Sequence, residues 1–200
     1  MRFLALGDSY TIGEGVETAV RWPVQLAALL RSQGIDLDDP TIIAVTGWTT
    51  DELAAGINRA NPQGPYDLVS LLIGVNNQYR GRGPEEYRRE IGELLRRAIG
   101  FANGRPTRVL ALSIPDWSVT PFAAGPDRED IRAQIDAFNA ISREEAQRAG
   151  VRYVDITPMS RRAATDRSLL AIDQLHPSGQ MYAEWARLAL PVAREALANS

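Results

Sequence analysis

Residues 68–73 have the sequence Leu68-Val69-Ser70-Leu71-Leu72-Ile73, an almost unbroken apolar run of strand length. A strand with one solvated face alternates apolar and polar residues, whereas a strand covered on both faces does not. A second run of the same kind is Val109-Leu110-Ala111-Leu112. These two runs predict interior strands of a parallel sheet with helices on both faces.

The rest of the chain alternates short β-rich runs with longer stretches of helical period, which is typical of an α/β fold with a parallel sheet. We expect five strands, at Arg2–Leu6, Thr41–Val45, Leu68–Ile73, Arg108–Ser113 and Arg152–Asp155. We find no internal repeat and no linker rich in proline, glycine or serine. The sequence therefore predicts a single domain over residues 1–200.

Helix start and stop signals fall between the predicted strands. Thr49 and Glu52 form a capping-box pattern, in which the two side chains satisfy free N–H groups at the start of a helix. A later helix is expected from about residue 127 to Gly150. The last is expected from about Pro177 to residue 197, and Pro191 should kink or split it because proline removes a helical hydrogen bond.

The composition excludes several kinds of chemistry. The chain has 200 residues, 44% of them hydrophobic and 24% charged, as in an ordinary globular protein. It has no cysteine, and all 22 basic residues are arginine, so thiolate nucleophiles, zinc sites that need sulfur and Schiff-base lysines are impossible. His176 is the only histidine, which excludes two-histidine metal motifs. We therefore expect no metal site.

Charge and hydropathy limit the partners. The net charge of −3 gives no general attraction to nucleic acid or to an anionic membrane. No apolar stretch reaches membrane-spanning length, and the first one is too short for a signal peptide. The sequence predicts a cytoplasmic protein that acts on a small molecule, with no nucleic-acid partner and no transmembrane segment.

Polar residues and glycines follow the predicted strands. In doubly wound sheets, ligands bind at the carboxyl ends of the strands, so these loops are where a site is expected. The first three strands are followed by Gly7-Asp8-Ser9, Thr46-Gly47-Trp48 and Gly74-Val75-Asn76-Asn77, and Asp173-Gln174-Leu175-His176-Pro177 comes near the end of the chain.

These loops contain each group that a serine hydrolase needs. Ser9 is the candidate nucleophile, His176 the general base and Asp173 the carboxylate that orients the base. The N–H groups of Ser9 and Gly47 and the side-chain amide of Asn76 are candidate donors to an oxyanion. Taken singly, most of them have ordinary roles in helix caps and turns, but their joint occurrence favours a catalytic site.

Together, the four segments resemble the SGNH hydrolase family, also called the GDSL-type esterases and lipases. Gly7-Asp8-Ser9-Tyr10, Gly47, Gly74-Val75-Asn76-Asn77 and Asp173-Gln174-Leu175-His176-Pro177 are similar to its four sequence blocks, in order. The resemblance implies a flavodoxin-like three-layer α/β/α sandwich, nucleophilic attack by Ser9 and no cofactor. Tyr10 stands where leucine is often found. Asn77 stands where aspartate is usual, which concerns a supporting hydrogen bond rather than the nucleophile or the base.

Four aromatic residues are candidates for the substrate pocket. Trp117 and Phe122 lie in the loop after the fourth strand, Tyr79 follows the oxyanion asparagine, and Trp48 follows Gly47. Packing in the core or under a loop is the alternative for each of them. Near Tyr79, Arg80 and Arg82 are either partners for a substrate phosphate or carboxylate, or solvated surface residues.

The sequence predicts a carboxylic ester hydrolase for small or single-chain acyl groups. Lysophospholipase, thioesterase, aryl esterase and carbohydrate deacetylase activities stay open, as do the acyl-chain length, the alcohol group and the oligomeric state. One alternative is a catalytically inactive binding module with a flavodoxin-like fold. Another is a nucleotide-binding domain, or one that accepts a phosphoryl group on Asp8 and requires Mg²⁺.

Overall fold

The computed structural model describes residues 1–123, 125 and 127–198. At its centre lies a five-stranded, all-parallel sheet with the strand order β2-β1-β3-β4-β5. The strands are β1 (Phe3–Gly7), β2 (Thr41–Ala44), β3 (Leu68–Leu72), β4 (Val109–Leu112) and β5 (Arg152–Val154). The ends of each strand agree with the predicted ranges to within one residue, which confirms the predicted five-stranded parallel sheet.

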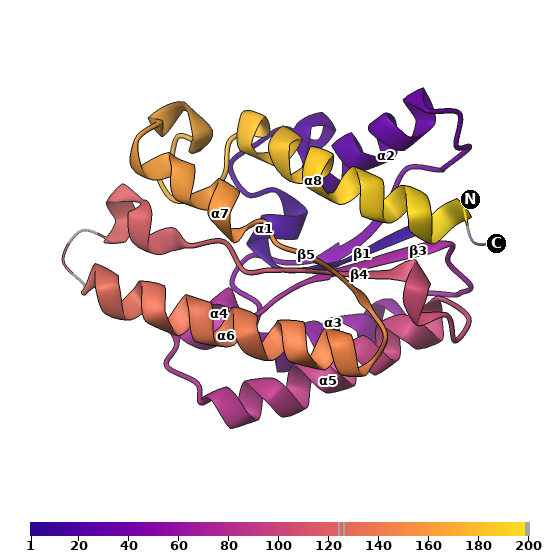
Figure 1. The fold of residues 1–200 in the computed structure, drawn as a ribbon, viewed down its shortest axis with the longest axis horizontal. Coiled ribbons are helices and arrows are strands. Elements are labelled where there is room, and N and C mark those ends of the chain that lie inside the picture. The colour runs from indigo at the N-terminus through magenta and orange to yellow at the C-terminus, as the bar shows by residue number, and fades with distance from the viewer. Residues whose placement is uncertain (124, 126, 199–200) are drawn as a thin grey trace.

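Helices cover both faces of this sheet, so the predicted three-layer α/β/α architecture is also confirmed. The helices are α1 (Ser9–Ile12), α2 (Trp22–Ser32), α3 (Thr50–Ala60), α4 (Val75–Tyr79), α5 (Pro84–Phe101), α6 (Arg128–Arg148), α7 (Thr157–Ser160) and α8 (Gly179–Ala198). Figure 1 shows α2 and α8 on one face and α3, α5 and α6 on the other. Among the described residues, no helix has the length and apolar character needed to cross a membrane.

The strand order creates a crevice at one edge of the sheet. After β1, the chain adds β2 on one side of β1 and then adds β3 on its other side. The order in which strands are added therefore reverses direction between β1 and β3. Every residue of β1 and β3 is buried, which explains why their sequences do not alternate. Beyond the carboxyl ends of such a strand pair lies the usual ligand site of this fold class. The short helices α1, α4 and α7 lie at this edge, on the left in Figure 1.

Local sequence signals account for the ends of two long helices. The backbone N–H of Thr49 donates to Oε2 of Glu52 at 2.9 Å, as part of the predicted capping box at the start of α3. The carboxylate of Asp127 accepts hydrogen bonds from two N–H groups of the first turn of α6. Beyond α6, Gly150 has a φ of 70°, a left-handed conformation that glycine adopts without strain.

The last helix differs from the prediction in two ways. It begins at Gly179, because Pro177 instead forms an isolated antiparallel bridge with Leu170. It also continues through Pro191 as one helix, so of the two expected effects, a kink or a split, the split does not occur. Pro191 and Arg187, whose carbonyl loses its helical donor, are both exposed, and water can take the place of the missing hydrogen bond.

The turn after β1 contains a buried carboxyl group. Asp8 is 0% exposed, and its Oδ1 accepts the N–H of Tyr10 at 3.0 Å. Its Oδ2 has no hydrogen-bond partner within the described residues. Burial raises the pKa of Asp8 to about 7, against the opposing effect of the hydrogen bond from Tyr10. This burial rules out Asp8 as a phosphoryl acceptor, because a phosphoryl donor cannot reach it.

The buried Asp8 should make the stability depend on pH. Between its ordinary pKa of 3.8 and about 7, the unfolded chain has released the Asp8 proton while the folded protein retains it. The free energy of unfolding should therefore fall by about 1.4 kcal/mol per pH unit as the pH rises through this window. Asp8→Asn keeps the Oδ1 acceptor and removes this contribution. Urea denaturation of both proteins at several pH values measures the difference.

The exposed Asp38 provides the control, since Asp38→Asn should leave the pH dependence of the wild type unchanged. If Asp8→Asn showed the same pH dependence as the wild type, the pKa of Asp8 would not be raised in the folded protein.

Candidate active site

Ser9 lies at the carboxyl end of β1, where the chain turns sharply into α1. The turn passes so close to β3 that a Cβ atom at Gly7 would lie 2.5 Å from the carbonyl oxygen of Leu72. Only glycine allows this approach. Asp8 then caps α1 through its bond to the N–H of Tyr10, and Ser9 is the first residue of the helix. The sequence of this turn thus places Ser9 at the crevice between β1 and β3.

Asn76 reaches the same crevice from the end of β3. Gly74 turns the chain with a φ of 132°, and a side chain there would lie 2.6 Å from the ring of Tyr87. The helix α4 starts directly afterwards, which places Asn76 in its first turn. Nδ2 of Asn76 donates to the carbonyl oxygen of Trp48 at 2.9 Å. This bond ties the Asn76 amide to the loop that contains Gly47.

The two arginines after Asn76 are bound to protein groups. Arg80 donates to the carbonyl oxygen of Gly47 at 2.7 Å and to Oε1 of Glu52 at 3.1 Å. Arg82 forms an ion pair with Asp51 at 2.7 Å. Both arginines therefore link the segment around α4 to α3 and the loop before it.

Asp173 and His176 form a pair within one tight loop. Gln174 adopts a left-handed conformation with a φ of 60°, and Oδ1 of Asp173 accepts the N–H groups of Leu175 at 3.0 Å and His176 at 2.9 Å. Oδ2 of Asp173 lies 2.6 Å from Nδ1 of His176. Since a carboxylate can only accept, this bond favours the tautomer in which Nδ1 carries the proton and Nε2 is a free base.

These contacts keep the Asp173 carboxyl ionised. Its partial burial acts to raise the pKa of the carboxyl group, but the hydrogen bonds from the His176 ring and from the two backbone N–H groups outweigh this effect. The pKa of Asp173 is therefore held below its ordinary value. The side chain of Asp173 is 36% exposed, whereas that of His176 is only 11% exposed. The carboxylate thus lies on the solvent side of the imidazole.

The four loops meet at a cavity of about 170 Å³. It is lined by Ser9, Tyr10, Thr46, Gly47, Val75, Asn76, Tyr79, Trp117, Phe122, Leu175 and His176. The structure thus brings together the candidate nucleophile, base and oxyanion donors, with Asp173 bonded to the base. Three of the four aromatic candidates are also among the lining residues.

The aromatic residues Tyr79, Trp117 and Phe122 form one wall of the cavity. The ring centroid of Trp117 lies 5.6 Å from that of Tyr79 and 6.0 Å from that of Phe122. Nε1 of Trp117 donates to the side chain of Gln78 at 2.9 Å, which fixes the central ring. Trp117 is buried, whereas Tyr79 and Phe122 are 57% and 49% exposed. The outer two rings therefore form the rim of the cavity.

Trp48 does not belong to this wall, which corrects the prediction. Its ring packs on Gly56 of α3, where a Cβ atom would lie 2.2 Å from it. Trp48 is not among the lining residues, and it contributes only the carbonyl group that binds Asn76. The sequence offered no signal for this orientation, because it depends on a glycine in a different element.

Four of the lining residues were not predicted from the sequence: Tyr10, Thr46, Val75 and Leu175. Each is the direct neighbour of a predicted site residue or, for Leu175, of the predicted base, and this adjacency was the only available signal. The ring of Tyr10 has its centroid 5.6 Å from that of His176, and thus packs near the candidate base.

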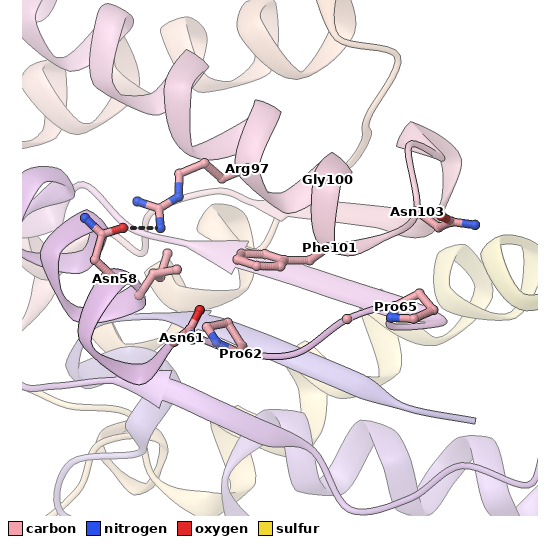
Figure 2. Close-up of a pocket in the computed structure, with 10 residues that line it drawn as sticks. Asn58, Asn61, Pro62, Pro65, Arg97, Gly100, Phe101 and Asn103 are labelled. Carbon is pink, nitrogen blue, oxygen red and sulfur yellow. Dashed lines mark hydrogen bonds between the residues drawn. The ribbon is translucent and has the colours of Figure 1, made fainter.

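A wider depression of about 690 Å³ lies at the opposite edge of the sheet. It is lined by the last turns of α3 and α5 and the loops that follow them, before β3 and β4 begin. Figure 2 shows Arg97 in this depression, hydrogen-bonded to Asn58 at 2.7 Å. A second bond joins Arg97 to the carbonyl oxygen of Ala54 at 3.0 Å. None of the predicted site residues lines it.

Comparison with known structures supports the fold. TesA is 19% identical to this chain with a TM-score of 0.77, and the match covers 98% of this chain and 100% of TesA. LAE5, an α/β hydrolase from the metagenome of Lake Arreo, Spain, is 24% identical with a TM-score of 0.69, over 98% and 95% of the two chains. A variant of Axe2, an acetyl xylan esterase from Geobacillus stearothermophilus, is 18% identical with a TM-score of 0.73, over 96% and 94%.

Comparison at the level of sequence identifies the family. None of the curated proteins matches this chain. The model of the GDSL-like lipase/acylhydrolase family, however, matches residues 5–184, which include all four of the segments that meet at the cavity. The protein is therefore a member of the GDSL-like lipase/acylhydrolase family of hydrolases.

Proposed function

We propose that the protein hydrolyses carboxylic esters of small or single-chain acyl groups through an acyl-enzyme on Ser9. The observation that supports this most directly is the 2.6 Å hydrogen bond that Oδ2 of Asp173 accepts from Nδ1 of His176, which lines one small cavity together with Ser9. A hydroxyl, an oriented base and a carboxylate at one cavity are the parts that acyl transfer needs.

In this proposal, Nε2 of His176 accepts the proton of the Ser9 hydroxyl as Oγ attacks the acyl carbon. The resulting oxyanion lies between the N–H groups of Ser9 and Gly47 and the amide of Asn76. His176 then gives its proton to the leaving alcohol. Water next attacks the acyl carbon as Nε2 of His176 accepts its proton, and the Ser9 oxygen leaves with that proton as the carboxylic acid is released. None of these steps requires a cofactor.

The hydrogen bonds of the three oxyanion donors support their role. Ser9 is the first residue of α1, so its N–H is one of the groups without an intrahelical partner. The N–H of Gly47 has no hydrogen-bond partner in the described part of the chain. The Asn76 amide uses one N–H bond for the carbonyl of Trp48, which leaves its second hydrogen for a ligand.

The size and lining of the cavity suggest the substrate class. At about 170 Å³ it is smaller than the roughly 300–1,000 Å³ of typical drug-binding pockets. Its lining is mainly aromatic and aliphatic, which suits a short or single acyl chain. Arg80 and Arg82 are engaged in ion pairs with α3, so the proposal needs no anionic group on the substrate.

The first test removes the nucleophile. Ser9→Ala should lower kcat on p-nitrophenyl esters by about 10³-fold or more, because the Ser–His unit fails without its hydroxyl. A fluorophosphonate probe should label the wild type and not this variant. Ser32→Ala, at an exposed position on α2, is the control and should be labelled normally. Near-normal turnover by Ser9→Ala would exclude it as nucleophile, and an unlabelled wild type would favour a binding module.

The second test concerns the aromatic wall. Phe122→Ala should lower kcat/KM for esters with longer acyl chains by about tenfold and change that for the acetate ester by less than about twofold, because only longer chains reach the rim. A graded series of p-nitrophenyl esters, together with an acyl thioester and an acetylated oligosaccharide, measures this. Ile172→Ala removes an apolar side chain that is 94% exposed and lies outside the cavity, so it should have no effect. A uniform loss across the series would contradict an acyl-binding role.

A further inference from the structure

Several hydrogen bonds join α4 to the loop that contains Gly47. Besides the bonds from Asn76 to Trp48 and from Arg80 to Gly47, the side chain of Asn77 binds Thr50 twice. Its Oδ1 accepts the N–H of Thr50 at 3.1 Å, and its Nδ2 lies 2.6 Å from the hydroxyl of Thr50. Asn76 and Asn77 of α4, together with Arg80 directly after it, therefore contact three of the four residues from Gly47 to Thr50.

The direction of these bonds follows from their chemistry. A backbone N–H can only donate, so the Asn77 atom that faces it is the carbonyl oxygen. The NH₂ group then faces the Thr50 hydroxyl and donates to it. Thr50 accepts this bond, and its single hydroxyl hydrogen is directed to Oε2 of Glu90 on α5. The result is a one-way chain of donors from Asn77 through Thr50 to Glu90.

Because these side chains are buried, water cannot easily replace the hydrogen bonds between Asn77, Thr50 and Glu90. Asn77 is 0% and Thr50 is 1% exposed, and Glu90 is half-buried. A buried polar atom that loses its partner costs free energy, because no water takes the partner's place. Arg82, which is paired with Asp51, interacts electrostatically with both Glu90 and Glu86, and Glu86 lies one helical turn before Glu90 on α5.

We infer that Asn77 and Glu90 are positioning residues, which act through the hydroxyl of Thr50 to hold the Gly47 and Asn76 donors at a fixed spacing. This inference rests on the proposed function for the role of those donors. The geometry supports it because Asn77 directly follows Asn76, and Thr50 lies three residues after Gly47 on the segment that α4 binds. The Asn77 and Glu90 side chains also form a matched pair, since one end of the chain must donate and the other must accept.

The matched pair predicts an unusual pattern of mutations. Asn77→Asp replaces the donor by an acceptor, so two carboxylates then compete for the one hydrogen of Thr50. We expect kcat to fall by about tenfold or more with KM nearly unchanged, and the thermal midpoint to fall by roughly 4–8 °C. Glu90→Gln alone should be nearly neutral, because its amide oxygen still accepts from Thr50.

The double variant Asn77→Asp/Glu90→Gln reverses every bond of the chain. The new amide donates to the Thr50 hydroxyl, Thr50 donates to the new carboxylate, and the other carboxylate oxygen still accepts the Thr50 N–H. We expect kcat to return to within about threefold of the wild type and the thermal midpoint to recover. The control is Asn77→Asp/Glu86→Gln, which removes one negative charge from the same helix without touching Thr50. It should not rescue either property.

The outcomes separate this inference from the proposed function. Equal rescue by Glu86→Gln would reduce the effect to net charge and overturn the pairing. If Asn77→Asp lowered the thermal midpoint but not kcat, and the double variant restored the midpoint, the bonds would be reversed as inferred. Their role in positioning the donors would then be overturned. If the double variant restored neither kcat nor the thermal midpoint, the inferred chain of hydrogen bonds from Asn77 through Thr50 to Glu90 would be overturned. The thermal midpoint is measured without substrate. It therefore tests the pairing of Asn77 with Glu90 even if the Ser9→Ala experiment contradicts the proposed function.

Discussion

The close approach of the β1 turn to β3 is the constraint on which the site depends. Gly7 lies so near the carbonyl of Leu72 that no residue with a side chain fits in its place. This contact brings the start of α1 beside the end of β3. Ser9 and Asn76 belong to these two segments and therefore meet at one crevice. The sheet thus determines where the two groups lie, and the loops determine only how they point.

The two remaining parts of the site are held by different means. Asp173 and His176 are oriented within a single loop, by bonds that exist before any ligand arrives. Gly47, in contrast, is held from outside its own loop, by a hydrogen bond from Arg80, the residue directly after α4. Preorganised donors and an oriented base need no rearrangement at the moment of reaction, which is where enzymes of this type gain most of their rate.

The sequence was sufficient to predict the strands and the four segments of the site, because both depend on local patterns. Apolar runs such as residues 68–73 identify buried strands, and the ends of parallel strands converge whatever the helices do. The orientation of Trp48 and the partnership of Thr50 with Glu90 were not predictable, because each depends on packing between elements far apart in the sequence. The continuity of α8 was not predictable for a similar reason, since only the folded structure shows that Pro191 is exposed to solvent.

The buried carboxyl of Asp8 has an electrostatic consequence for the residue that follows it. In the low-dielectric interior, two negative charges a few ångströms apart repel each other far more strongly than they do in water. In the proposed mechanism, an ionised Asp8 would thus oppose the oxyanion that forms on a substrate attached to Ser9. Because burial raises the pKa of Asp8 to about 7, the group is neutral in acidic and mildly acidic solution. Over that range, the turn beneath the proposed nucleophile carries no charge of its own, and the field around the reacting oxygen would be set by the hydrogen-bond donors.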